Sequence, residues 1–85
     1  MNITQHYSSK AELDIVVHVG DILDEQNMRR VEHALLKVTG VERARFNYER
    51  QHLLIIGYNP AQTDSSKILK LVKQQQLNAQ LIGGI

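Results

Sequence analysis

The chain has 85 residues, of which 42% are hydrophobic, so it is long enough for one domain with an apolar core and too short for two. Its formal net charge is +1, from 10 basic and 9 acidic residues, whereas surfaces that bind nucleic acid carry a clear basic excess; we therefore expect no nucleic-acid partner. The chain contains no cysteine, which excludes disulfides, iron–sulfur clusters, thiol nucleophiles and thiolate zinc sites.

The first segment, residues 1–12, is polar and lacks the apolar stretch of a secretory signal. We expect it to be a flexible N-terminal tail, and we expect the protein to be cytoplasmic. No apolar run approaches the roughly 18 residues of a membrane span, so no direct membrane span is expected. A strand is predicted next, because apolar residues alternate with other residues at the period of a strand: Leu13, Ile15, Val17 and Val19.

A helix is predicted after the break at Gly20 and Asp21. Asp24 suits the N-cap, and Glu25 suits the positive first turn. Spacings of three and four residues then predict one buried apolar stripe, made of Met28, Val31, Leu35 and Val38. The side chains expected to face away from it are Arg29, Arg30, Glu32 and Lys37. Gly40 is expected to end the helix.

Two strands are predicted after this helix. The first begins at Val41 and alternates. Its expected core side is Ala44, Phe46 and Tyr48, and its expected outer side is Arg43, Arg45 and Asn47. Residues 49–51 are polar and indicate a hairpin loop. The second strand is predicted from His52 to Tyr58, and its apolar run over residues 53–56 favours a central position in the sheet.

Asp64 or Ser65 is expected to cap a second helix. Its residues at helical spacing are Ile68, Leu71, Val72 and Gln75, and the glutamines at 74–76 are expected to extend its end. A last short strand is predicted from Ala79 to Ile82. Residues 83–85 are then the C-terminal end of the domain or a linker.

The predicted order is strand, helix, strand, strand, helix, strand. This order predicts an α+β fold of the ferredoxin-like βαββαβ type over residues 13–82. Right-handed crossovers would place both helices on one face of a four-stranded antiparallel sheet. The first and third strands would be central.

Short sequence features lie along this plan in a specific order. Val31-Glu32 and Ala34-Leu35 lie on the first helix, and Gly40-Val41 leads into a strand that ends in Phe46-Asn47. Tyr58-Asn59-Pro60 and Leu77-Asn78-Ala79 follow. This order resembles the heavy-metal-associated (HMA) domain family over residues 13–82. The resemblance implies a module associated with heavy-metal transport or homeostasis, with a protein partner or a transporter domain as its partner.

The family's metal site is a pair of cysteines three residues apart, and counting back from Val31-Glu32 places that pair at Asp24 and Asn27. Cu(I) prefers sulfur ligands, so these oxygen-bearing side chains do not replace the thiolates. With Asp21 and Glu25 they offer oxygens to a divalent metal ion, although their spacing matches no established cation loop. Helix capping explains them better. No cofactor is assigned, and a divalent ion at Asp24 and Asn27 stays an open alternative.

No catalytic constellation is present in the sequence. The histidines are scattered and include no pair at the i, i+4 spacing of zinc enzymes: His6, His18, His33 and His52. We expect each to be solvated or at an interface, with a zinc site as the lesser alternative. The chain has neither a glycine-rich phosphate loop nor a serine-centred elbow, and we expect a protein that is not an enzyme.

The sheet face opposite the helices is the expected contact surface. Its predicted residues are Val16, His18, Leu53 and Ile55, with Arg43 and Arg45 at the far side and Ile82 from the edge strand. A two-layer domain leaves this face in water, and an apolar patch there favours a partner surface, including a homodimer. Scattered surface apolar residues are the alternative. The second functional candidate is a ferredoxin-like small-molecule regulatory (ACT-like) or protein-interaction domain.

Overall fold

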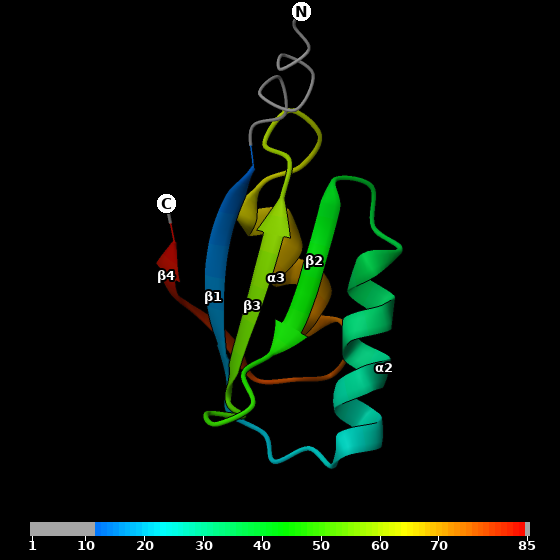
Figure 1. Ribbon diagram of the computed structural model, residues 1–85, viewed down its shortest axis with the longest axis vertical. Helices are drawn as coiled ribbons and strands as arrows, with labels where there is room; N and C mark the ends of the chain where they lie inside the picture. The colour runs from blue at the N-terminus through cyan, green and yellow to red at the C-terminus, as the bar shows by residue number, and fades with distance from the viewer. Residues whose placement is uncertain (1–11, 85) are drawn as a thin grey trace, which may run out of the picture.

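The computed structural model describes residues 12–84. The elements follow in the order β1 (Leu13–Val19), α2 (Glu25–Leu36), β2 (Val41–Phe46), β3 (Leu53–Tyr58), α3 (Ser65–Lys73) and β4 (Ala79–Gly84). The strands form one antiparallel sheet in the order β2-β3-β1-β4. Buried residues of both helices pack against one face of it, and Figure 1 shows α3 behind the sheet and α2 beside its β2 edge. The predicted α+β, ferredoxin-like βαββαβ fold is confirmed, with β1 and β3 central.

The core lies between the helices and one face of the sheet. Alternate residues of the central strands are almost fully buried, namely Ile15, Val17, Leu54 and Ile56. The helices cover them with Met28, Val31, Leu35, Ile68 and Val72. This follows from the period of each element, because a strand buries every second residue and a helix buries one stripe. No helix in the described range is long and apolar enough to cross a membrane.

Aspartates begin both helices. Asp24 accepts a hydrogen bond from the Asn27 backbone N–H at 2.8 Å. Asp64, rather than Ser65, does the same for the Lys67 N–H at 2.9 Å. That bond, together with the Ser66 hydroxyl, lowers the pKa of the Asp64 carboxyl below its ordinary value.

Gly40 lies in the turn after α2 rather than at the helix end, because α2 stops at Leu36. Its φ of 96° is left-handed, which glycine adopts without steric cost. A Cβ added there would approach the Gln62 Cβ and the Thr63 Cγ2 to 2.9 Å. The position therefore requires glycine for both its backbone angle and its close contacts.

Besides the end of α2 and the start of β3, which is at Leu53 and not His52, three more boundaries differ from the sequence prediction. The α3 helix ends at Lys73, and residues 74–76 form a turn in which Gln76 has a φ of 65°, so the glutamines do not extend it. The β2 strand ends at Phe46, and the predicted core position of Tyr48 is wrong because its side chain is 83% exposed. The β4 strand continues to Gly84, past the expected end at Ile82.

Candidate functional site

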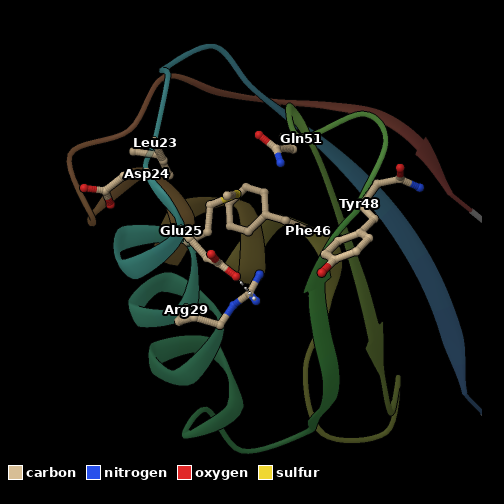
Figure 2. Close-up of a pocket in the computed structure, with 9 residues that line it drawn as sticks. Leu23, Asp24, Glu25, Arg29, Phe46, Tyr48 and Gln51 are labelled. Carbon is tan, nitrogen blue, oxygen red and sulfur yellow. Dashed lines mark ion pairs between the residues drawn. The ribbon is translucent and has the colours of Figure 1, made fainter.

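A hollow of about 350 Å³ lies between the start of α2 and the β2–β3 hairpin (Figure 2). Its apolar lining is Leu23, Met28 and Phe46, and its polar lining is Asp24, Glu25, Arg29, Asn47, Tyr48 and Gln51. In Figure 2 the Asp24 carboxylate points away from the Phe46 ring. The volume is near the lower end of small-molecule sites, which span roughly 300–1,000 Å³. The hollow is therefore large enough for a small ligand.

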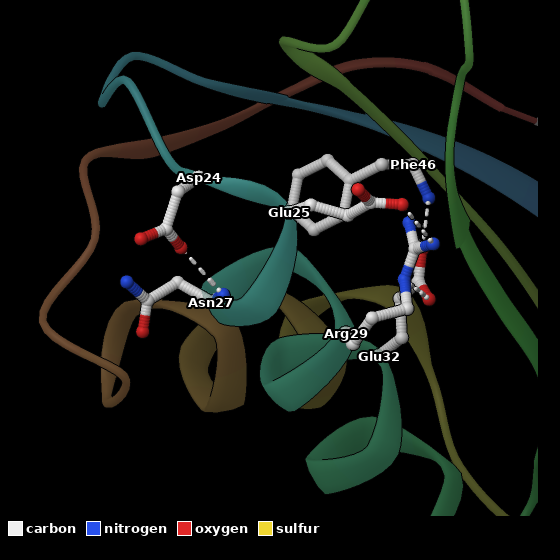
Figure 3. A network of polar contacts seen from close by, with 6 residues as sticks. All are labelled: Asp24, Glu25, Asn27, Arg29, Glu32 and Phe46. Atoms are coloured by element: carbon white, nitrogen blue, oxygen red, sulfur yellow. Dashed lines mark hydrogen bonds and ion pairs between the residues drawn. The ribbon is translucent and has the colours of Figure 1, made fainter.

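Asp24 and Asn27, where the family resemblance would place two cysteines, are engaged in hydrogen bonds at the start of α2 (Figure 3). Besides the cap from Asp24 to the Asn27 N–H, the Asn27 Oδ1 accepts from Arg30 Nη2 at 2.6 Å. Asp21, expected beside them, instead accepts from the Asn78 N–H at 2.7 Å. Between residues 12 and 84, no group of three or more His, Asp or Glu side chains could hold a metal ion. This geometry supports capping, and the divalent ion at this site stays a prediction.

Glu32 is buried, with only 8% of its surface exposed, so its predicted solvent-facing position is wrong. Its Oε2 accepts from the Phe46 backbone N–H at 2.8 Å and from Arg29 Nη2 at 3.2 Å (Figure 3). Arg29 Nε lies 2.9 Å from Glu32 Oε1, an ion pair without the alignment of a hydrogen bond. Phe46 ends an edge strand, where outward N–H groups lack a strand partner. Glu32 supplies the acceptor, and Arg29 balances its buried charge.

The face of the sheet away from the helices, here called the open face, carries Val16, His18, Leu53 and Ile55. The register pairs Val16 with Ile55 and His18 with Leu53, and all four side chains are half-buried. Arg45 is exposed and lies opposite Ile55. Ile82, at a register shift in β4, is 52% exposed. The register thus places Val16, His18, Leu53, Ile55 and Arg45 on one face of the sheet, and their role as an interface stays a prediction.

Arg43 lies across the open face in an ion-paired row. The register aligns Arg43, Gly57 and Asp14 on neighbouring strands. Arg43 Nη2 is 2.6 Å from Asp14 Oδ1, and its Nε is 3.0 Å from Glu12 Oε2. A Cβ at Gly57 would lie 2.7 Å from Arg43 Nη2, so the glycine leaves room for the guanidinium. Arg43, which the sequence placed on the outer side of its strand, is therefore exposed and ion-paired within the chain.

His18 and His52 lie together, which the sequence analysis missed. Their rings are stacked, with centroids 5.7 Å apart and an interplanar angle of 24°. His52 Nδ1 is 3.0 Å from the Val19 carbonyl oxygen, whereas His33 is exposed on α2. The predicted pairing of the first and third strands could have revealed this contact, because it places His52 next to the end of the first strand. In the structure, the Val19 N–H donates to the His52 carbonyl at 2.8 Å. His6 lies outside the described residues.

Neither a protein-family profile nor a curated protein matches this sequence. Solved structures do match. A copper-binding domain of HMA7, a P-type ATPase, has a TM-score of 0.76 at 21% identity, covering 85% of this chain and 96% of that one. The N-terminal domain of a potential copper-translocating P-type ATPase from Bacillus subtilis, Cu(I)-loaded, has a TM-score of 0.77 at 20% identity, covering 88% and 92%.

Oxidized MerP from Ralstonia metallidurans CH34 has a TM-score of 0.72 at 18% identity, covering 84% of this chain and 97% of that one. At these identities the likeness establishes a shared fold. The comparisons and the sequence resemblance thus agree on the fold, although they rest on different observations.

Replacing Asp24 by Ala is expected to lower the free energy of unfolding by about 1 kcal/mol, because the Asn27 N–H loses its acceptor. Asp24→Ser keeps an acceptor oxygen and should retain most of the stability. Asp64→Ala, which removes the cap of α3, is the matched control and should cost a similar amount. Urea unfolding measures all three. An Asp24→Ala variant as stable as wild type would contradict the capping interpretation.

Replacing Glu32 by Ala is expected to cost about 1–3 kcal/mol, because it leaves the buried Phe46 N–H without its acceptor. Glu32→Gln keeps an acceptor oxygen and loses the charge, so its cost should be smaller. Glu25→Gln removes only an exposed 3.9 Å pair with Arg29 and should change stability by less than about 1 kcal/mol. The same unfolding measurement ranks the variants. Equal costs for Glu32→Ala and Glu25→Gln would refute the role assigned to Glu32.

Proposed function

We propose that this chain is a non-enzymatic HMA-like domain of heavy-metal transport or homeostasis that acts through protein contacts. The link to heavy-metal transport or homeostasis is supported by the fold, which is shared with a copper-binding ATPase domain, a Cu(I)-loaded ATPase domain and MerP. The ordered sequence features from Val31-Glu32 to Leu77-Asn78-Ala79 are independent support. The partner would be a transporter domain or a second copy of the chain. The cytoplasmic location expected from the sequence stays a prediction.

One observation carries the proposal: the side chains at the two expected cysteine positions accept hydrogen bonds from α2 itself. The Asp24 carboxylate accepts from the first turn of α2, and the Asn27 amide oxygen accepts from Arg30. Neither side chain offers the soft sulfur that Cu(I) prefers. In this proposal the domain keeps the fold of a metal carrier without carrying Cu(I) at that turn.

The contact surface in this proposal is the open face. Its apolar side chains, Val16, Leu53 and Ile55, are half-buried within the chain and lie side by side on β1 and β3. Neither helix covers them, since the buried residues of both helices pack on the other face of the sheet. Arg45 at the margin adds a positive charge that an acidic partner residue would recognise. A contiguous apolar patch with a polar margin is typical of a protein-interaction site.

The hollow beside α2 favours a second candidate, a small-molecule regulatory domain. Its lining combines the Phe46 ring with the charged Glu25 and Arg29, which is the mixture of apolar wall and few polar groups found in ligand sites. Arg29 is already paired with Glu32 at 2.9 Å, so it is less available to a ligand. We therefore favour the proposal of a domain that acts through protein contacts over that of a small-molecule regulatory domain.

A gain-of-binding experiment tests the first proposal. In competition with a chromophoric Cu(I) chelator under reducing conditions, wild type should take no stoichiometric Cu(I). Asp24→Cys combined with Asn27→Cys should take about one ion, because a helix N-terminus favours the thiolates that bind soft ions. Asp24→Ser combined with Asn27→Ser is the matched control and should behave as wild type. Stoichiometric Cu(I) on wild type would overturn the proposal.

A further inference from the structure

We propose that His18 and His52 form half of a Zn²⁺ site, which the same two residues of a second copy complete. The inference rests on the proposed contact through the open face and names the ion and the residues that would join the copies. His18 lies in β1, and His52 immediately precedes β3. Their rings lie next to each other, with centroids 5.7 Å apart. Imidazole nitrogen is a common zinc ligand, and these two rings are stacked on each other.

The hydrogen bond of His52 prepares one nitrogen for a metal ion. Its Nδ1 lies 3.0 Å from the Val19 carbonyl oxygen. A carbonyl only accepts, so this bond places the hydrogen on Nδ1 and leaves the lone pair on Nε2. Zinc-bound histidines use the same arrangement, in which a backbone carbonyl fixes the ring and its tautomer. His52 is also exposed, so an ion reaches it from solvent.

The distance between the rings fits a shared ion. A zinc–nitrogen bond is about 2.0–2.1 Å long, and the ring centre lies a little over 1 Å beyond the nitrogen. Two imidazoles on one ion therefore have centroids about 5.2 Å apart at the tetrahedral angle and at most about 6.5 Å apart. The observed 5.7 Å lies between these values, and the rings, stacked with an interplanar angle of 24°, have to turn so that each directs a nitrogen at a common ion. The His18 ring makes no hydrogen bond within residues 12–84, so it can turn toward the ion, whereas the His52 ring is held at the Val19 carbonyl oxygen.

The ligand count requires a second molecule. Zinc sites in proteins are mostly four-coordinate, and one chain supplies two imidazoles here, with no third acidic or histidine side chain grouped with them in the described part. A second copy related by a two-fold axis presents the same surface. If the open faces approach each other, His18 and His52 of both copies surround one ion. The same approach removes Val16, Leu53 and Ile55 from water, which favours the dimer.

Zinc titration of the intact, chelator-treated chain tests the proposal. Isothermal titration calorimetry and native mass spectrometry should find one Zn²⁺ per two chains, and sedimentation velocity should show a monomer becoming a dimer on zinc addition. His18→Gln and His52→Gln should each weaken zinc binding by at least about tenfold, since even the loss of an outer-shell partner costs that much. His33→Gln, which changes an exposed histidine of α2, is the matched control and should bind zinc as wild type does. Urea unfolding verifies that each variant is folded.

A second readout examines the atoms directly. Two-bond ¹H–¹⁵N spectra should show the Nδ1–H tautomer of His52 before zinc is added and a large shift of its Nε2 resonance afterwards. One Zn²⁺ per monomer without dimers would overturn the shared site, as would zinc binding that survives both histidine substitutions, or no binding at all. Any of these leaves the Cu(I) experiment unaffected, so the failure of the zinc site and the failure of the proposed function are distinguishable.

Discussion

The carboxylate of Glu32 fixes helix α2 to the edge of the sheet, and the surfaces discussed above depend on that contact. The edge strand β2 has an outward N–H at Phe46, and the carboxylate accepts it at 2.8 Å while Arg29 balances the charge. Such charge-assisted bonds are stronger than neutral ones, and an unmatched carboxylate there would be costly. With α2 held in this position, its first turn faces the hairpin across the hollow, and the opposite side of the sheet stays uncovered.

Capping and soft-metal binding are alternative uses of the same turn. The first turn of a helix has N–H groups without partners and a partial positive charge, so it stabilises an anion. Thiolates would use that environment, and here the Asp24 carboxylate uses it. An aspartate at this position therefore satisfies the helix without offering the sulfur that a soft ion prefers. This explains how the fold persists at a turn that has no sulfur.

Local sequence patterns predicted the features that neighbouring residues determine. The alternation from Leu13 to Val19 and the Asp24 cap agree with the structure because a local pattern determines each. Glu32 was misplaced because spacing on a helix does not reveal an N–H on another element that needs an acceptor. Asn47 ended β2 early by accepting the N–H groups of Glu49 and Arg50, at 2.9 and 2.8 Å, a turn that competed with continued alternation. The alternation in the strands was enough to predict which residues lie on the open face. The contacts between those residues, such as the stacking of His18 on His52, depend on the strand register, which the alternation does not give.

The open face has two chemically different ends, and this decides which part suits a partner. At one end, Gly57 leaves room for Arg43 to reach Asp14 and Glu12. Such surface pairs add little stability, about 0–1 kcal/mol, but a partner would have to break them to use that guanidinium. At the other end, the His18 ring has no hydrogen bond within residues 12–84, and the His52 ring is held through Nδ1, 3.0 Å from the Val19 carbonyl oxygen. Recognition of a metal ion or a protein therefore costs least at the imidazole end, next to the apolar middle of the face.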